Sequence, residues 1–329
     1  MKIAIVKLSS LGDIVHTMVV LQFIKKYQPN SEVEWIVEKR FKGILENNPN
    51  IDQIHTVNFQ SIKRNKSIKS LFIELSKIKK FGNYDLVIDF QGLLKTSIVA
   101  KSINSKKIVG FDWSSARESL SAFAYNQRVN ISYDKNSIVR YAKLASEALN
   151  IKITLDDLNN KEPYLFSRSE VLIPQTSYIV FVIGSTWPSR NYPKEKFVQI
   201  ANALKKQCLV VWGSDEEKQK AEWLEGESKY IKAMSKLSLD ELKYVISQSN
   251  LLIGNDTGPS HMSWALNIPS VILFGPTPVE RAYQTDINLT IKSHSKINHW
   301  KLNKKDFSIK DISVDDVVKM SHHLLNNSS

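Results

Sequence analysis

The sequence predicts an α/β protein built from two doubly wound parallel sheets, and three observations support that prediction. Short apolar runs alternate with amphipathic segments along most of the 329 residues, as in strand–helix–strand units. The alternation breaks between 152 and 175, where polar residues cluster and two prolines occur. Glycine-containing loops follow the strands that end near Lys7 and Ile253, at the edge where such sheets bind ligands. We therefore expect one domain over 1–167, a second over 168–329, and a site in a cleft between them.

The first predicted domain opens on the run Lys2-Ile-Ala-Ile-Val6, whose consecutive aliphatic residues favour a buried strand. A helix over 13–28 follows, because Ile14, Met18 and Leu21 recur on one helical face. The same patterns predict further strands at 33–37, 54–57, 86–90 and 107–110. They predict further helices at 40–47, 67–80, 92–103 and 137–150.

The second predicted domain repeats this alternation. Apolar, mostly β-branched or aliphatic runs predict strands at 178–183, 208–212, 230–233, 251–254 and 270–274. Segments of helical periodicity predict helices at 193–206, 216–225, 239–247 and 259–266, and a last helix at 314–326. Two series of similar length fit two Rossmann-like domains.

Composition and charge narrow the classes of function. The chain is 42% hydrophobic and 24% charged, which excludes a disordered or collagen-like polymer. Its net charge is +12, so we expect an anionic partner. Residues 1–167 carry +9 of this charge, so we expect the first domain to bind that partner. The single cysteine, Cys208, lies in a predicted strand and fits a reducing cytosol. Neither a secretory signal nor an apolar stretch of spanning length is found.

The most informative motif is Gly254-Asn-Asp256-Thr257-Gly258-Pro-Ser-His261, which joins a predicted strand to a predicted helix. Backbone N–H groups at such a junction bind anions, Gly258 admits a close phosphate, and the Asp256 carboxylate suits sugar hydroxyls. The alternative is a helix start with Asp256 or Thr257 as the N-cap. The motif is neither a Walker A nor a dinucleotide fingerprint.

A second candidate loop follows the first strand of the second domain. It contains Ser185, Thr186 and Arg190, and two hydroxyls with a guanidinium suit a diphosphate. The alternative is an ordinary strand–helix loop. The loop Phe274-Gly-Pro-Thr-Pro278 is explained by turn chemistry, with a pocket-lining role as its alternative.

Loops of the first domain offer acid–base and anion-binding groups. In Ser9-Ser10-Leu-Gly12-Asp13, the Asp13 carboxylate is either a general base or a residue that favours a helix start. Gln91 and Lys95 follow one predicted strand, and Arg117 follows another; they suit acidic ligands or ordinary surface ion pairs. In the basic run 63–80, apolar residues recur at helical spacing (Ile68, Leu71, Phe72, Leu75 and Ile78), which favours a core stripe over a membrane anchor. The basic flank of the run fits either a solvated helix face or an anionic lipid surface. The sequence contains no metal-ligand spacing and no nucleic-acid-binding signature.

Taken together, these motifs resemble the bacterial lipopolysaccharide heptosyltransferases, which are inverting glycosyltransferases of the GT-B architecture. The stretches that carry the resemblance are 6–17 and 256–261, while 89–95 and 112–118 are similar to heptosyltransferase I. The resemblance implies two Rossmann-like domains, with the acceptor on the first, ADP-heptose on the second, and the last helix packed back on the first. It implies a cytoplasmic enzyme at the inner membrane that adds heptose to the Kdo of lipid A, with no tightly bound cofactor.

The resemblance also assigns roles to residues. Asp13 would be the base that deprotonates the acceptor hydroxyl. Residues implied to bind the donor are Ser185, Thr186, Arg190, Glu217, Leu237, Asp256, Thr257, Gly258 and His261. Residues implied to face the acidic acceptor are Ser10, Gly12, Lys63, Arg64, Gln91, Gly92, Lys95, Arg117 and Arg140. The serine at 185 and the arginine at 190 stand where other members often have threonine and lysine.

Three alternatives stay open at this point. One is heptosyltransferase II or another sugar-nucleotide transferase of the same fold. Another is a basic, non-catalytic binder of nucleic acid or a membrane surface, which the net charge suggests but which leaves the loop motifs unexplained. The third, a nicotinamide-dependent dehydrogenase, lacks its dinucleotide fingerprint here.

Overall fold

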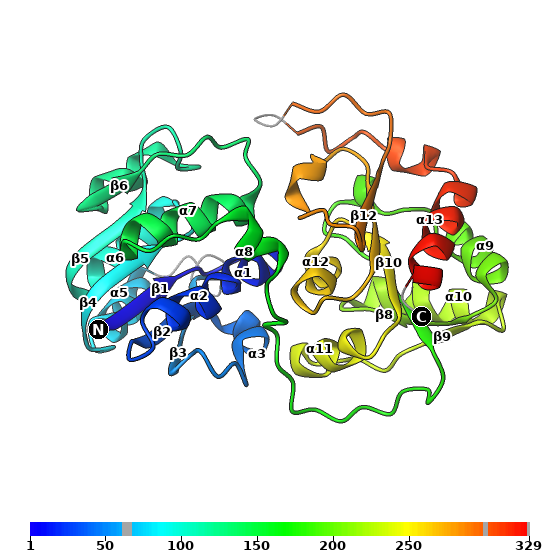
Figure 1. Ribbon diagram of the computed structural model, residues 1–329, viewed down its shortest axis with the longest axis horizontal. Coiled ribbons are helices and arrows are strands. Elements are labelled where there is room, and N and C mark those ends of the chain that lie inside the picture. Colours follow the sequence, from blue (N-terminus) through cyan, green and yellow to red (C-terminus); the bar gives the residue numbers. More distant parts are fainter. Residues whose placement is uncertain (61–67, 299–301, 328–329) are drawn as a thin grey trace. The chain divides into compact units, whose positions relative to one another are not determined.

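The computed structural model describes residues 1–60, 68–298 and 302–327 and contains two compact units, Met1–Tyr164 and Leu165–Ser329 (Figure 1). Each unit contains one six-stranded sheet in which every pairing between neighbouring strands is parallel. The prediction of an α/β fold with two doubly wound sheets is therefore confirmed.

The first unit contains the strands β1 (Lys2–Val6), β2 (Glu32–Glu38), β3 (Gln53–Val57), β4 (Asn83–Asp89), β5 (Asn104–Phe111) and β6 (Gln127–Val129). Its helices are α1 (Leu11–Met18), α2 (Val20–Tyr27), α3 (Lys42–Leu45), α5 (Ile68–Ile78), α6 (Leu94–Ser102), α7 (Ser137–Leu149) and α8 (Leu155–Asn159), with 3₁₀ turns η1 (Lys39–Phe41) and η2 (Ser119–Ala124). The strand order is β3-β2-β1-β4-β5-β6. The order reverses between β1 and β4, so their carboxyl ends form the switch point where doubly wound sheets bind ligands.

The helices cover the two faces of this sheet separately. Helix α7 packs on α1 and α2, whereas α6 packs on α5 and η2. Inward side chains of the second group, such as Ile78, Val99 and Ala122, enter one core cluster with Val6 and Val87 of the sheet. Ile78 of α5 lies in this core and Leu75 packs against it, whereas Phe72 of the same helix is 68% exposed, so the apolar periodicity of α5 only partly reflects core packing.

The second unit contains the strands β7 (Tyr178–Val182), β8 (Gln207–Val211), β9 (Ile231–Ala233), β10 (Leu251–Asn255), β11 (Ser270–Phe274) and β12 (Asn288–Lys292). Its helices are α9 (Lys194–Leu204), α10 (Asp215–Glu227), α11 (Leu239–Ser247), α12 (Gly258–Ala265) and α13 (Val314–Asn327), with 3₁₀ turns η3 (Pro188–Arg190), η4 (Val279–Arg281) and η5 (Ser308–Asp311). The strand order β12-β11-β10-β7-β8-β9 repeats that of the first unit, read from the other edge. Its switch point lies between β7 and β10.

Several element predictions need correction. The helix expected over 13–28 is divided into α1 and α2 at Val19, whose backbone angles (φ −56°, ψ −30°) are still helical. The short strand β6 and the half-polar strand β12 lack the apolar runs by which strands were predicted. Helix α8 lies in the segment expected to be a connection; Thr154 caps it.

The last helix belongs to the second unit. Helix α13 packs on α9, β10 and β11, and its side chains Val317 and Leu324 lie in the core of the second unit. Its amphipathic periodicity predicts a buried stripe, but periodicity alone does not say which core the stripe joins.

A buried ionic cluster lies at the amino-terminal ends of the first sheet's strands. The Glu34 side chain on β2 contacts Lys2 Nζ at 2.6 Å and His55 Nε2 at 2.5 Å, and it accepts a hydrogen bond from the Tyr84 hydroxyl. Burial disfavours the charged carboxylate, but the bonds from Lys2, Tyr84 and His55 outweigh it and lower the pKa of Glu34 to about 2. The cluster therefore stabilises the fold only while Glu34 is ionised.

We expect Glu34→Gln to lower the free energy of unfolding by about 3 kcal/mol at neutral pH, because it breaks a buried ion pair. The stabilisation by ionised Glu34 is complete above the ordinary carboxyl pKa and is lost as the pH falls toward 2. Urea unfolding of the wild type should therefore show a steeper loss of stability on acidification than the variant shows.

Glu32→Gln is the matched control, since exposed Glu32 pairs with the same Lys2 at 3.0 Å. It should change stability by less than about 1 kcal/mol, as is usual for surface pairs. An equal effect of the two substitutions would contradict the role given to burial.

Candidate active site

The loop after β1 positions Asp13 at the switch point of the first sheet. Asp13 lies in the first turn of α1, where its Oδ2 accepts hydrogen bonds from the Ser10 hydroxyl at 2.7 Å and the Ser10 backbone N–H at 3.2 Å. Its other oxygen, Oδ1, accepts a bond from the Tyr141 hydroxyl of α7 at 3.3 Å. The half-buried carboxylate is thus held from both sides.

Lys7 links this carboxylate to the core. Its Nζ donates to the Tyr141 hydroxyl at 2.8 Å and to the Phe90 carbonyl at 3.1 Å, and only 2% of the residue is exposed. Burial lowers the pKa of Lys7 to about 8, although the charges of Asp13 and Asp89 oppose that shift. At neutral pH, Lys7 is therefore mainly a buried cation that reaches Asp13 through a tyrosine hydroxyl.

The positive charge of Lys7 acts directly on Asp13. Burial raises the pKa of the carboxyl, but the charge of Lys7 and the hydrogen bonds from Ser10 outweigh burial and lower it to about 2. Asp13 is consequently ionised at neutral pH, which is the form that accepts a proton.

The loop after β4 is fastened to the loop after β1. Gln91 Oε1 accepts from the Leu8 N–H at 2.8 Å, and Gln91 Nε2 donates to the Ser9 hydroxyl at 3.2 Å. Gly92 has φ +65°, a left-handed conformation that favours glycine, and its N–H donates to Asp89. The two switch-point loops therefore form one hydrogen-bonded unit around Asp13.

The other predicted acceptor residues differ in their surroundings. Gly12 is buried within α1, while Lys95 and Arg117 are exposed. Arg140 is buried; its guanidinium donates to the Ser115 carbonyl and stacks on Phe111 and Tyr133. The charges of Arg117 and Arg140 both act on Lys7, so the structure places positive charge around Asp13. Lys63 and Arg64 lie outside the described residues.

In the second unit, Arg190 joins the two loops of the switch point. Its Nε donates to the Ser185 hydroxyl at 2.8 Å in the loop after β7, and a terminal nitrogen contacts Asp256 Oδ2 at 3.3 Å after β10. Asn255 adds a second link, since its side chain donates to the Ile183 carbonyl at 2.7 Å and accepts from the Tyr192 N–H. The strand order therefore brings together Ser185, Arg190 and Asp256, as the two sequence motifs require.

Asp256 is an almost fully buried anion, with 2% of the residue exposed. Besides Arg190, its carboxylate contacts His261 Nε2 at 3.1 Å, the Thr277 hydroxyl at 2.7 Å and the Arg281 guanidinium at 3.9 Å. These donors outweigh the cost of burial and lower its pKa well below the usual range. Asp256 thus orients several donors around a fixed negative charge.

Thr257 and Gly258 begin helix α12, directly after Asp256. Thr257 is the N-cap residue, and neither Thr257 nor Gly258 is fully buried. The first N–H groups of a helix have no partner within that helix, so they favour an anion at this end.

Glu217 lies at the same edge of the second sheet. It belongs to the first turn of α10, accepts from the Gly213 N–H at 2.7 Å, and lies so close to Gly184 that a side chain at 184 would clash with it. Leu237 is half-buried between β9 and α11, and Thr186 is exposed.

Some site residues escape sequence reasoning. The sequence predicts only that Tyr141 lies in a helix. Lys7 is the signal that could point to such a residue, because a lysine buried after a strand needs polar partners nearby. Thr277 belongs to the loop 274–278, for which the sequence offers a pocket-lining role only as the alternative to a turn. Arg281 lies beyond that loop, and the sequence does not specify that β11 is the neighbour of β10. Within the described residues, no group of three or more histidine, cysteine or acidic side chains is arranged to hold a metal ion.

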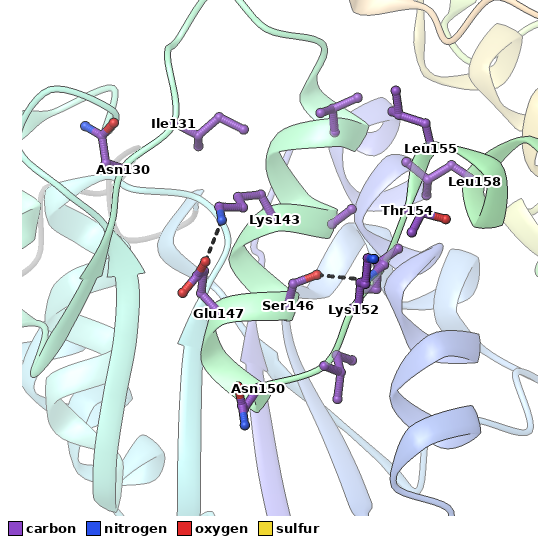
Figure 2. A pocket seen from close by; sticks show the side chains of 14 residues that line it. Asn130, Ile131, Lys143, Ser146, Glu147, Asn150, Lys152, Thr154, Leu155 and Leu158 are labelled. Atoms are coloured by element: carbon purple, nitrogen blue, oxygen red, sulfur yellow. Dashed lines mark hydrogen bonds and ion pairs between the residues drawn. The ribbon is translucent and has the colours of Figure 1, made fainter.

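A surface pocket of about 480 Å³ lies on the first unit, and none of these site residues lines it. Figure 2 shows its lining by α7 and the segment that follows it, where Lys143 pairs with Glu147 and Ser146 accepts from the Ile153 N–H. Because these polar groups already have partners, the pocket presents few groups that converge on a ligand.

Comparison with known proteins identifies the family. The sequence profile of Glycosyltransferase family 9 (heptosyltransferase) matches residues 75–311, which is more than half of the chain. The chain belongs to this family. It is therefore a glycosyltransferase, and the predicted enzyme class is confirmed.

Individual relatives agree with the family assignment. Lipopolysaccharide heptosyltransferase 1 of Campylobacter coli is 38% identical to this glycosyltransferase, over 99% of this chain and all of that one. The solved structure of Escherichia coli heptosyltransferase WaaC with ADP is 22% identical, with a TM-score of 0.82 over 98% of this chain and 100% of that one. The same enzyme with ADP-2-deoxy-2-fluoro heptose is also 22% identical, with a TM-score of 0.80 over 98% and 99%. These structures support the GT-B fold expected from the sequence.

Proposed function

We propose that this enzyme transfers heptose from ADP-heptose to the Kdo of lipid A, with inversion at the anomeric carbon. The observation that carries the proposal is the similarity to a lipopolysaccharide heptosyltransferase 1 along the whole of both chains. The reaction forms a bond from an acceptor oxygen to heptose C1 and breaks the bond from C1 to the ADP oxygen. The acceptor proton goes to the enzyme, and the electron pair of the broken bond leaves with ADP.

The second unit would bind the donor. Structures of WaaC with ADP and with a fluoro-heptose analogue of its nucleotide sugar support this donor class. Arg190 and Ser185 would hold the diphosphate, together with Thr186 and the N–H groups of Thr257 and Gly258. Because negative charge grows on the leaving diphosphate, donors fixed beforehand by Asp256 would stabilise the transition state more than the bound substrate.

Other predicted donor residues would act beside the diphosphate. His261 would lie beside the diphosphate as a further polar group, because the carboxylate of Asp256 contacts the His261 ring and fixes its position. Glu217 and Leu237 would border the adenosine, a role that fits their positions after β8 and β9.

Asp13 would be the general base. A carboxylate with a pKa of about 2 is a weak base, but the acceptor hydroxyl becomes strongly acidic as its oxygen bonds to C1. The proton of the acceptor hydroxyl can therefore be transferred late, after the bond to C1 has begun to form. It goes to a carboxylate that is already ionised and that Ser10 and Tyr141 orient. We infer that Lys7 and Tyr141 are positioning residues, which hold Asp13 in this form without touching the sugar.

Positive charge around Asp13 would bind the acidic acceptor. Kdo carries a carboxylate and lipid A carries phosphates, which Lys95, Arg117, Lys63, Arg64 and Arg140 would face. Ser10, Gly12, Gln91 and Gly92 would shape the acceptor pocket, because Gln91 fastens its two loops together.

Acceptor binding should weaken with salt. Between 0.1 M and 1 M salt the Debye length falls from about 10 Å to about 3 Å, so exposed Lys95 and Arg117 attract the acceptor less. We expect the acceptor KM to rise several-fold, while the donor KM changes less because Arg190 is buried. Initial rates at varied acceptor and salt concentrations measure this; an acceptor KM that ignores salt would contradict the proposed electrostatic role.

Acceptor choice tests the proposed function. ADP release should require ADP-heptose together with Kdo-lipid A, and should be slow with an acceptor that already carries one heptose. Preference for that second acceptor would assign the enzyme to heptosyltransferase II instead. If the enzyme releases nucleotide from another nucleotide sugar and releases no ADP from ADP-heptose, the proposal that ADP-heptose is the donor is wrong.

The location of the reaction follows from the proposed acceptor. A lipid-linked acceptor and a cytosolic nucleotide sugar would meet at the cytoplasmic face of the inner membrane, on an anionic surface. Within the described residues, no helix is long and apolar enough to cross a membrane. The net charge of +12 supports peripheral binding to anionic lipid.

A further inference from the structure

One face of the first unit carries an unusual share of the chain's exposed apolar side chains. Among the described residues, twelve large apolar side chains are exposed, and seven of them belong to α5, α6, η2 and the loop before η2. These seven are Phe72, Ile73, Leu94, Ile98, Trp113, Leu120 and Phe123. We propose that they form a docking face that inserts into an anionic lipid bilayer. This inference rests on the proposed lipid-linked acceptor.

The exposed apolar residues form stripes rather than scattered points. On α5, Phe72 and Ile73 are exposed, and 68% of Phe72 is accessible; exposed Lys69 precedes them on the helix, and exposed Lys80 follows the end of the helix. On α6, Leu94 and Ile98 are one turn apart. On η2, Leu120 and Phe123 are spaced by three residues, which places them on one side of a 3₁₀ turn.

The three stripes belong to one face of the sheet. Helix α6 packs on both α5 and η2, and the opposite sides of all three elements supply Ile78, Val99, Ala100 and Ala122 to the same core. Since their inner sides contribute to the core, their outer sides point away from it. Trp113 extends the face, because its ring contacts that of Phe123 at 4.3 Å.

The charges on this face select an anionic occupant. The segments 68–80, 93–102 and 113–128 contain eight basic residues and two acidic ones. Both acids are engaged locally: Glu74 pairs with Lys77 at 3.3 Å, and Glu118 accepts from the Leu94 N–H at 2.7 Å. A second copy of the same face would bring like charges together, whereas anionic headgroups attract the basic rim while the apolar side chains enter the bilayer.

The docking face adjoins the acceptor loops. Helix α6 begins directly after the Gln91–Gly92 turn, and the Gly92 carbonyl accepts from the Glu118 N–H at 3.1 Å. The face thus reaches the edge of the sheet where Asp13 lies. An enzyme docked in this way would meet its acceptor at the headgroup level, where the sugar of a lipid-linked acceptor stands.

Vesicle flotation of the full chain tests the docking face directly. The protein should float with vesicles of phosphatidylethanolamine and phosphatidylglycerol, and float much less with phosphatidylcholine alone. The double variant Phe72→Ser/Phe123→Ser should lower partitioning roughly a hundredfold, since each buried aromatic contributes about tenfold or more. Lys69→Gln/Lys80→Gln should weaken binding less and make it less dependent on salt, because it removes two of the eight basic residues.

Leu155→Ser/Leu172→Ser is the matched control, because it removes two exposed apolar side chains elsewhere and should leave partitioning unchanged. Equal loss in this control, or full vesicle binding by Phe72→Ser/Phe123→Ser, would overturn the proposal. If sedimentation shows that the wild type is a dimer and that Phe123→Ser is a monomer, the face would bind a second copy of the chain instead of lipid.

Activity separates this inference from the proposed function. The Phe72→Ser/Phe123→Ser variant should keep its rate on a deacylated, water-soluble acceptor and lose rate only on vesicle-bound acceptor. A loss on both would overturn the docking role. If the wild type transfers heptose to neither acceptor, the proposed function fails, while flotation still decides whether the face binds lipid.

Discussion

Replacement of Asp13 by asparagine is expected to lower kcat by about two to four orders of magnitude, with the dissociation constant for ADP-heptose almost unchanged. The amide keeps the size of the side chain but cannot accept the acceptor proton. The proposed donor contacts lie in the second unit and include none with Asp13. Steady-state rates with saturating substrates, together with calorimetric titration of the donor, measure the two effects separately.

Ser10→Ala is the control for this substitution. It removes the hydroxyl bonded to Asp13 at 2.7 Å but leaves the carboxylate in place. We expect a much smaller loss of rate than for Asp13→Asn, since the Tyr141 hydroxyl still contacts the carboxylate. Equal losses of kcat and donor affinity in a folded Asp13→Asn protein would contradict the base assignment.

Arg190→Lys should reduce kcat/KM for ADP-heptose by roughly 10²–10³, which corresponds to about 3–4 kcal/mol of transition-state stabilisation. The guanidinium contacts Ser185 and Asp256 with different nitrogens, and in the proposed site its remaining N–H groups would bind the diphosphate. A lysine ammonium keeps the charge but cannot reproduce that planar arrangement. Initial rates at subsaturating donor measure the change.

Arg281→Lys provides a graded comparison for Arg190. Arg281 is more exposed and lies 3.9 Å from Asp256, so its replacement should cost much less. Thermal unfolding of both variants shows whether the fold survives. Unchanged kcat/KM in a folded Arg190→Lys protein would remove Arg190 from the diphosphate site.

Much of the fold is predictable from the sequence, because buried parallel strands and amphipathic helices have distinct periodicities. The short strand β6 is not, since three residues carry too little pattern. The destination of α13 also escapes prediction, because a buried stripe such as Val317 and Leu324 specifies a partner surface only in three dimensions.

The candidate site, too, is predictable from the sequence only in part. Asp13, Arg190 and Asp256 are recognisable because each follows a predicted strand, where doubly wound sheets bind ligands. Tyr141 contacts Asp13 across 128 residues, and nothing in its local sequence says which side of α7 faces α1. Thr277 joins Asp256 only because β11 pairs with β10, which is a property of strand order.

The most direct test of the central proposal is the mass of the acceptor after incubation with the purified enzyme and ADP-heptose. We predict that Kdo-lipid A gains one heptosyl unit for each ADP released, and that Asp13→Asn lowers the rates of both together by about two to four orders of magnitude. ADP release without a matching gain in acceptor mass, or a gain on an acceptor that lacks Kdo, would contradict the proposed transfer.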